Sequence, residues 1–162
     1  MAIVRPVTKT VISTTEFGIP VVDAINNFDP HIVAKVSAMV GGAITAGVWT
    51  NAPGISVTFT PKANWCYEFK FGTCLVGGAA GSWWAVTLTN LPGGANPWTR
   101  ALAFSTNYYN WGHTVDASGF CNGTLAATPI TVQMQANVSG ANGTFNNGQE
   151  SYIYVINHGP KV

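Results

Sequence analysis

Apolar and polar residues alternate along much of the chain from residue 36 onward. The alternation is clearest in residues 67–71 (YEFKF) and 130–135 (ITVQMQ), where one face is apolar and the other polar. A period of two is typical of a half-buried antiparallel strand. Such runs predict eight strands, at residues 36–50, 55–61, 65–76, 82–91, 99–106, 113–121, 129–139 and 151–157.

Turn-forming sequences separate these runs, among them NAPG, VGGAAG, LPGGANP and SGANGTFNNG. Glycine, proline and asparagine supply the backbone conformations that tight turns require. Eight short strands at regular spacing, without a helix-length segment among them, are typical of a β-sandwich. We therefore predict an all-β fold, an antiparallel jelly-roll β-sandwich.

The first 35 residues have a different pattern. Residues 1–14 are rich in β-branched side chains, which predicts an extended arm. A short helix over residues 19–27 is expected from an approximate apolar stripe formed by Ile19, Val22, Ala24, Ile25 and Phe28. The dipeptide Asp29-Pro30 would stop that helix, which is too short to be stable alone in water. The predicted organisation is an arm and helix at 1–35 and a β-domain at 36–162.

Charge is scarce: charged residues make up 8% of the 162 residues and hydrophobic residues 47%. A typical soluble protein has about 25% charged residues, so much of this surface is expected to be covered by partners. Seven Lys and Arg and six Asp and Glu are scattered singly, with a net charge of +1. Nucleic-acid binding is not expected because no basic patch is present. No run of about 20 apolar residues occurs, so no membrane span is expected.

The chain lacks the motifs of enzymes and metal sites. Neither GxSxG nor HExxH occurs, and the glycine pairs at 41–42, 77–78 and 93–94 do not precede a helix, so they indicate turns or strand irregularities. His113 lies near Asp116, but a loop histidine beside a turn aspartate is the simpler interpretation. Three cysteines without metal-ligand spacing indicate free, mostly buried thiols. We predict no enzymatic activity, no cofactor and no metal.

Aromatic residues are the one site-like feature. They gather within residues 83–111, with asparagines between them, and they are Trp83, Trp84, Trp98, Tyr108, Tyr109 and Trp111. Aromatic rings with nearby amides suit a glycan, whose C–H faces stack on rings. The same rings also suit packing between subunits or within the domain. In a strand, one of Trp83 and Trp84 must point inward and the other outward.

The last run, SYIYVIN, is apolar at alternate positions. This pattern predicts a strand that is central in its sheet or at an oligomer axis, with an ordinary edge strand as the alternative.

Both ends of the chain resemble a known family. TTEFGIPVVDAINN resembles the N-terminal segment of small structural proteins of tailed phages that infect actinobacteria. SYIYVINHGPKV is similar to their final strand, although Asn157 and His158 stand where an acidic residue and its neighbour are usual. The glycine-rich strands between are similar to jelly-roll domains of tumour-necrosis-factor and complement-head shape.

The resemblance implies a minor tail protein, capsid decoration protein or head fibre that assembles as a homotrimer. Its expected location is the virion, after assembly in the bacterial cytoplasm, and its expected partners are major capsid or tail proteins. The arm would anchor it through Val4, Val7, Val11, Ile12, Phe17, Ile19, Val22 and Ile25. A lectin-like module that binds a host cell-surface glycan is the alternative function. Tail and capsid locations both stay open at this point.

Overall fold

The computed structural model describes residues 30–77, 79, 81–91, 99–103, 113–121, 127–146 and 148–160. Within 99–103 and 113–121 it describes the backbone and, of the side chains, only Ser118. The described residues form strands and connections, without a helix. The strands are β1 (His31–Met39), β2 (Gly42–Ile44), β3 (Thr50–Phe59), β4 (Trp65–Gly77), β5 (Trp83–Thr89), β6 (Thr99–Ala103), β7 (His113–Cys121), β8 (Ile130–Val138), β9 (Gly143–Phe145) and β10 (Glu150–Pro160).

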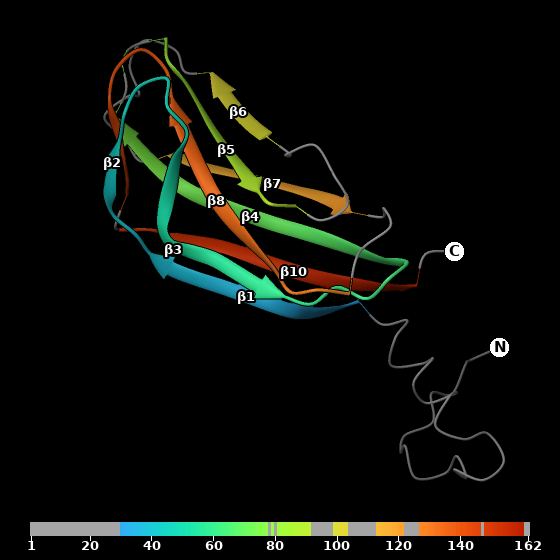
Figure 1. Cartoon of the computed structure of the whole chain (residues 1–162). Coiled ribbons are helices and arrows are strands. Elements are labelled where there is room, and N and C mark those ends of the chain that lie inside the picture. The colour runs from blue at the N-terminus through green and yellow to red at the C-terminus, as the bar shows by residue number, and fades with distance from the viewer. Residues whose placement is uncertain are drawn as a thin grey trace, which may run out of the picture.

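Two antiparallel sheets pack face to face, so the predicted all-β antiparallel sandwich is confirmed. The six-stranded sheet has the order β1-β10-β4-β9-β2, and β7 also pairs with β4. The four-stranded sheet has the order β3-β8-β5-β6. In Figure 1, β3 and β8 of the four-stranded sheet cross in front of β4 and β10. Strands far apart in sequence are neighbours in both sheets, as in a jelly roll.

The last strand is central, as one sequence interpretation held. β10 pairs with β1 on one side, with Lys35 opposite Tyr154, and with β4 on the other, where Lys70 lies opposite Tyr154. Its side chains alternate strictly between buried and partly exposed from Ser151 to Gly159. The period of two in SYIYVINHG therefore follows from one face in the core and one face outside.

Two predicted strand boundaries are corrected. The run at 36–50 was expected to be one strand, but β1 begins at His31 and ends at Met39, and β2 follows as a separate short strand. The turn sequence NAPG was expected to end a strand, but it lies within β3, where the pairing with β8 shifts register between Asn51 and Ser56. Proline and glycine are tolerated there because β3 is an edge strand and the shift is a bulge.

One strand was missed. β9 lies within SGANGTFNNG, which the sequence pattern assigns to a turn. Its three residues pair with β2 on one side and with the end of β4 on the other. A three-residue strand rich in glycine has too few apolar positions to show alternation, so only its pairing reveals it. The predicted helix at 19–27 lies outside the described residues.

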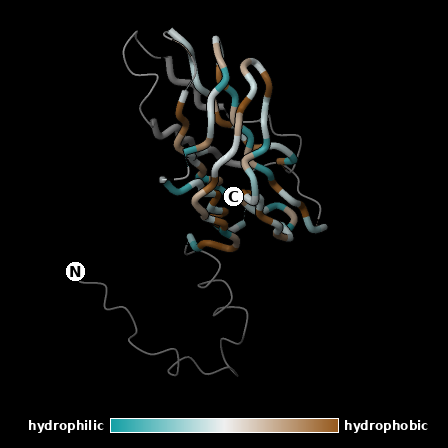
Figure 2. Tube along the Cα trace, turned by 90° about the vertical axis from the view of Figure 1, so that its left-hand side faces the viewer, coloured by the Kyte–Doolittle hydropathy of each residue, from teal (hydrophilic) through white to brown (hydrophobic). Residues whose placement is uncertain are grey.

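The core lies between the sheets and consists of inward-facing residues of both. Its largest fully buried side chains include Trp84, Phe69, Phe71, Ile55 and Leu88. Hydrophobic and polar positions follow one another along the strands in Figure 2, as expected when each sheet has one dry face. Burial of this kind stabilises the fold by roughly 25 cal/mol for each Å² of apolar surface removed from water.

Candidate functional site

The outer face of the six-stranded sheet carries most of the charged side chains that the structure describes. Lys35 on β1, Glu68 and Lys70 on β4, and Glu150 on β10 belong to this sheet, and Lys62 precedes β4. Strand register explains the grouping: Glu68 lies opposite Ile156, and Lys70 lies opposite Tyr154, so their side chains share the outer face. This face is therefore the polar and ionisable side of the described domain.

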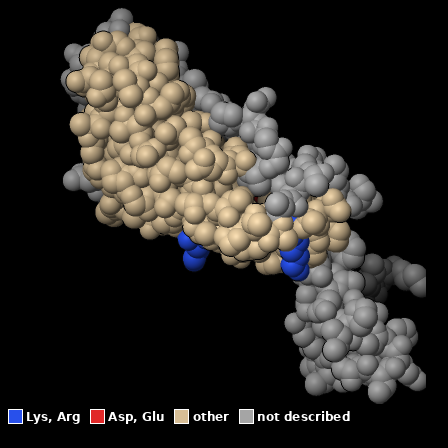
Figure 3. Space-filling view, viewed as in Figure 1, with Lys and Arg blue, Asp and Glu red and all other residues tan. Residues whose placement is uncertain are grey.

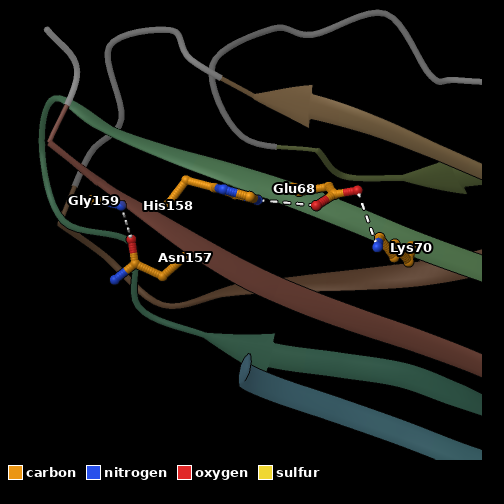
Figure 4. Close-up of polar contacts among 5 residues, drawn as sticks. All are labelled: Glu68, Lys70, Asn157, His158 and Gly159. Carbon is orange, nitrogen blue, oxygen red and sulfur yellow. Dashed lines mark hydrogen bonds and ion pairs between the residues drawn. The ribbon is translucent and has the colours of Figure 1, made fainter. Parts of the chain in front are cut away.

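A three-residue polar cluster lies at one end of this face (Figure 4). His158 Nε2 lies 2.9 Å from Glu68 Oε2, and Lys70 Nζ lies 3.6 Å from Glu68 Oε1. Glu68 is 9% exposed, so its carboxylate is largely removed from water. The Lys70 ammonium and the hydrogen bond with His158 offset the cost of burying that charge.

Backbone geometry places His158 over Glu68. Asn157 accepts a hydrogen bond at 2.9 Å from the backbone N–H of Gly159, whose φ of 93° suits glycine. The register between β10 and β4 shifts between Asn157 and Pro160. Sequence reasoning treated Asn157 and His158 only as a departure from a family pattern, because a partner 90 residues away in sequence gives no local signal.

Two tyrosines stack on the middle of the same face. The rings of Tyr152 and Tyr154 are 5.1 Å apart with an interplanar angle of 25°. A depression beside Tyr154 is lined by Lys35, Val36 and Ser37. Ser37 also donates a hydrogen bond to Glu150, which fixes β1 against β10 at the edge of this depression.

The outer face of the four-stranded sheet carries no charge among the side chains described there. Its outward positions hold hydroxyl, amide, alanine and indole groups: Asn51, Ser56, Thr58, Trp83, Ala85, Thr87, Thr89, Thr131, Gln133, Gln135 and Asn137. Three of these, Ala85, Thr87 and Asn137, are nonetheless buried, at 1%, 4% and 4% exposure. Among the coloured atoms of Figure 3, which shows this side of the molecule, no acidic group appears and basic groups appear at two places along the lower edge. The two faces therefore have different chemistry.

The adjacent tryptophans at the start of β5 point to opposite faces of the sheet, as successive residues of a strand do. Trp84 is 1% exposed and lies in the core, whereas Trp83 is 40% exposed on the outer face. Trp84 was named as a contact for a glycan or a subunit, and its burial corrects that prediction. Trp83 stays available for either role.

Several predicted site residues lie outside the described residues or side chains. These are the anchoring set Val4, Val7, Val11, Ile12, Phe17, Ile19, Val22 and Ile25, together with Trp98, Tyr108, Tyr109 and Trp111. His113 and Asp116 lie on β7, where the structure describes the backbone alone.

Catalytic and metal-binding groups are sparse in the described part of the chain. No group of three or more His, Cys, Asp or Glu that could hold a metal occurs among the described residues. Cys66 and Cys74 are free, as predicted. Burial raises the pKa of the Cys74 thiol, against a smaller lowering by the hydrogen bond from Asn146, so this thiol is a poor nucleophile. The described residues also include no helix long and apolar enough to cross a bilayer.

Sequence reasoning missed Trp49, which directly precedes β3 and is 40% exposed. It lies outside the aromatic cluster at 83–111 and is as exposed as Trp83.

No protein-family model matches the chain, and no curated protein matches it. Solved structures similar to it include the infectious bursal disease virus VP2 subviral particle, at 11% identity and a TM-score of 0.48, over 82% of this chain and 33% of that one. Eiger TNF from S. frugiperda is 8% identical with a TM-score of 0.47, over 78% and 92%. PRD1 vertex protein P5 is 11% identical with a TM-score of 0.47, over 78% and 97%. This chain spans about a third of the VP2 chain, and at these identities and TM-scores the similarities carry no information about function.

Proposed function

We propose that this protein is a structural component of a bacteriophage particle, a homotrimer that displays its jelly roll on the capsid or tail. The observation that carries the proposal is that one chain combines a phage-like N-terminal segment with a β-sandwich that has few charges. A charge-poor sandwich begins at the edge strand β1, directly after a segment that resembles phage structural proteins. A chain with so few charges is expected to have much of its surface covered in an assembly.

The outer face of the six-stranded sheet is the proposed subunit interface. It presents the Tyr152 and Tyr154 stack and Ile156 from the central strand β10, and tyrosine is enriched in interfaces. The contacts of Glu68 with His158 and Lys70 lie beside these rings and would form a polar rim. Three copies related by a three-fold rotation axis would cover the same face on each subunit.

The proposed anchor comprises residues 1–35, whose last five form the start of β1. β1 is an edge strand, with Ile32 at 52%, Val33 at 39% and Met39 at 70% exposure. No other described strand pairs with its outer edge. An open strand edge with apolar side chains can receive an extended segment from another chain. The arm of residues 1–35 is proposed to add to such an open edge on a protein of the particle.

The proposed role is mechanical and not catalytic. The described carboxylates Glu68 and Glu150 each contact a neighbouring side chain on the sheet surface. Of the two described thiols, Cys74 is buried and Cys66 is partly buried. An arrangement of this kind stabilises strands and does not present a nucleophile with its base.

Deleting residues 1–30 tests the anchor. The truncated protein is expected to keep its strand spectrum and its trimeric mass in solution, and to be absent from particles assembled in its presence. Full-length Thr58→Ala, altered at an exposed position of β3 on the other sheet, is the matched control and should join particles normally. If the folded truncated protein still joins particles, the anchor is located elsewhere and the proposal fails.

A further inference from the structure

Three connections between strands meet at one end of the sandwich, which we call the loop end. They are residues 45–49 between β2 and β3, residues 78–82 between β4 and β5, of which 79, 81 and 82 are described, and residues 139–142 between β8 and β9. Figure 1 shows this end at the upper left, whereas β1 begins and β10 ends at the other end of the domain. The loop end therefore lies opposite the point where the proposed anchor joins the domain.

Hydrogen bonds join the three loops to one another. The backbone N–H of Ala46 donates to Oδ1 of Asn142 at 3.0 Å, which ties the first loop to the third. The backbone N–H of Trp83, directly after the second loop, donates to Oγ of Ser139 at 2.8 Å, which ties the second loop to the third. The backbone N–H groups that donate within the loop end are those of Ala46, Gly47, Val48, Ala79, Ser82, Trp83, Ser139 and Ala141. These groups have protein partners and do not need water as an acceptor.

Three large apolar side chains are exposed at the loop end. Val48 is 51% exposed, and Trp49 and Trp83 are each 40% exposed. The residue before Val48 bonds to Val138 on one side of β8, and the residue after Trp83 pairs with Val138 on the other side. Two strand spacings, about 10 Å, therefore separate the backbones of these two segments. The three side chains belong to the same end of the domain.

The loop end carries no charged side chain. Each of its loops lies within a long run of sequence that contains no Asp, Glu, Lys, Arg or His, namely residues 36–61, 71–99 and 117–149. Among the coloured atoms of Figure 3, the basic groups appear only along the lower edge, away from the loop end at the upper left. A partner of this surface cannot be held by charge pairs, so it must be held by apolar and interfacial contacts.

From these observations we infer that the loop end binds the surface of a neutral phospholipid bilayer, with Val48, Trp49 and Trp83 entering the interface. Indoles favour the membrane–water interface because the ring is apolar and its N–H is polar. An aliphatic side chain such as that of Val48 also gains by leaving water there. Backbone groups that already have hydrogen-bond partners can leave water without losing one. The inference goes beyond the role in the particle, since it concerns the end of the domain opposite the proposed anchor.

Flotation of the full chain with phosphatidylcholine vesicles tests the inference. The unaltered protein should float with the vesicles to the same extent in low and high salt, because no charge pair holds it there. Added anionic phosphatidylserine should not strengthen the binding. Val48→Asp, Trp49→Ala and Trp83→Ala should each weaken binding by at least about tenfold, because each removes apolar surface from the contact and the first also adds a charge. Circular dichroism of each variant should show the strand content of the unaltered protein.

Thr58→Asp is the matched control for Val48→Asp. Thr58 has the branched shape of valine, is exposed on β3 and pairs with Thr131 near the end of the domain opposite the loop end. The control adds the same charge and should float as the unaltered protein does. Failure of the unaltered protein to float, flotation that high salt abolishes, or equal losses in Thr58→Asp and Val48→Asp would each overturn the inference.

A second copy of the chain is the competing occupant of the loop end. Sedimentation of the variants in the absence of vesicles decides between the two. The inference predicts that Val48→Asp and Trp49→Ala keep the mass of the unaltered protein. If either variant has a lower mass, the loop end lies between subunits and the membrane contact is excluded.

Discussion

Thr73 on β4 and Ser151 on β10 share a hydrogen bond of 2.7 Å between their hydroxyl oxygens inside the sandwich. Both side chains are buried, at 0% and 1% exposure, among apolar core residues. Each hydroxyl is the other's partner, so neither buried group is left without a hydrogen bond. The pair joins the central strand β10 to β4 near the point where β10 begins.

Removing one hydroxyl of this pair should lower the free energy of unfolding more than removing both hydroxyls does. Thr73→Val leaves the Ser151 hydroxyl buried and unpaired, and we expect a loss of about 1–3 kcal/mol in the free energy of unfolding. The double variant Thr73→Val with Ser151→Ala should be clearly more stable than the sum of the two single losses predicts. Urea denaturation of all four proteins measures the coupling. Strictly additive losses would show that the two hydroxyls do not depend on each other.

The two adjacent tryptophans of β5 should differ sharply in their effect on stability. Trp84→Ala empties part of the core and should cost about 3–5 kcal/mol. Trp83→Ala acts on a partly exposed side chain and should cost about 1 kcal/mol or less. Chemical denaturation followed by circular dichroism compares them. Similar losses for both would mean that the inward and outward assignments are incorrect.

Gly77, at the end of β4, should not tolerate a side chain. Its φ is +98°, and a Cβ atom there would lie 2.9 Å from the Cα of Gly143, its pairing partner on β9. Gly77→Ala should therefore cost at least about 2 kcal/mol, from backbone strain together with a clash against main chain. Gly54→Ala is the control, because φ is +70° there but no atom lies within 4 Å of the added Cβ. Thermal unfolding should rank Gly54→Ala as the milder change, and equal shifts would refute the close approach of β4 and β9.

Stability should decline in alkali. Burial raises the pKa of Cys74 above its ordinary 9.0 and that of Tyr67 above its ordinary 10.0. Above these ordinary values the unfolded chain has released protons that the folded chain still holds. The free energy of unfolding therefore falls as pH rises, beginning near pH 9, whereas below that pH this contribution is fully present.

Cys74→Ala and Tyr67→Phe should each make this alkaline decline shallower. Unfolding temperatures between pH 8 and pH 11, a range that brackets the ordinary pKa values of both groups, measure the slope. The same slope in the unaltered protein and in both variants would assign the decline to other groups.

The fold class could be predicted because alternation reports directly on burial. In β4 the inward residues Tyr67, Phe69 and Phe71 are the apolar ones of YEFKF. In β8 the apolar residues of ITVQMQ are Val132 and Met134, which are buried in the core, and Ile130, which packs against it. The local sequence pattern does not predict the strand correctly where the backbone is irregular. Pro53 and Gly54 looked like a turn, yet Gln133 donates hydrogen bonds to the carbonyls of Ala52 and Ile55 and holds that bulge within the sheet.

The candidate sites were less accessible to sequence reasoning, since they consist of residues far apart in the chain. Glu68 and His158 meet only because β4 pairs with β10, and Asn51 and Gln135 meet only because β3 pairs with β8. The spacing of residues in the sequence does not reveal how these strands pair. Trp83 was identified because tryptophan is conspicuous within the aromatic cluster at 83–111, whereas Trp49, which is equally exposed, lies outside that cluster.

Quantitative mass spectrometry of purified particles, combined with the solution mass of the isolated protein, tests the central claim most directly. The proposed function predicts that the protein is present in particles in a copy number divisible by three and that it sediments as a trimer. Hundreds of copies would favour the capsid surface, and a handful would favour the tail. Absence from purified particles would contradict the proposed structural role.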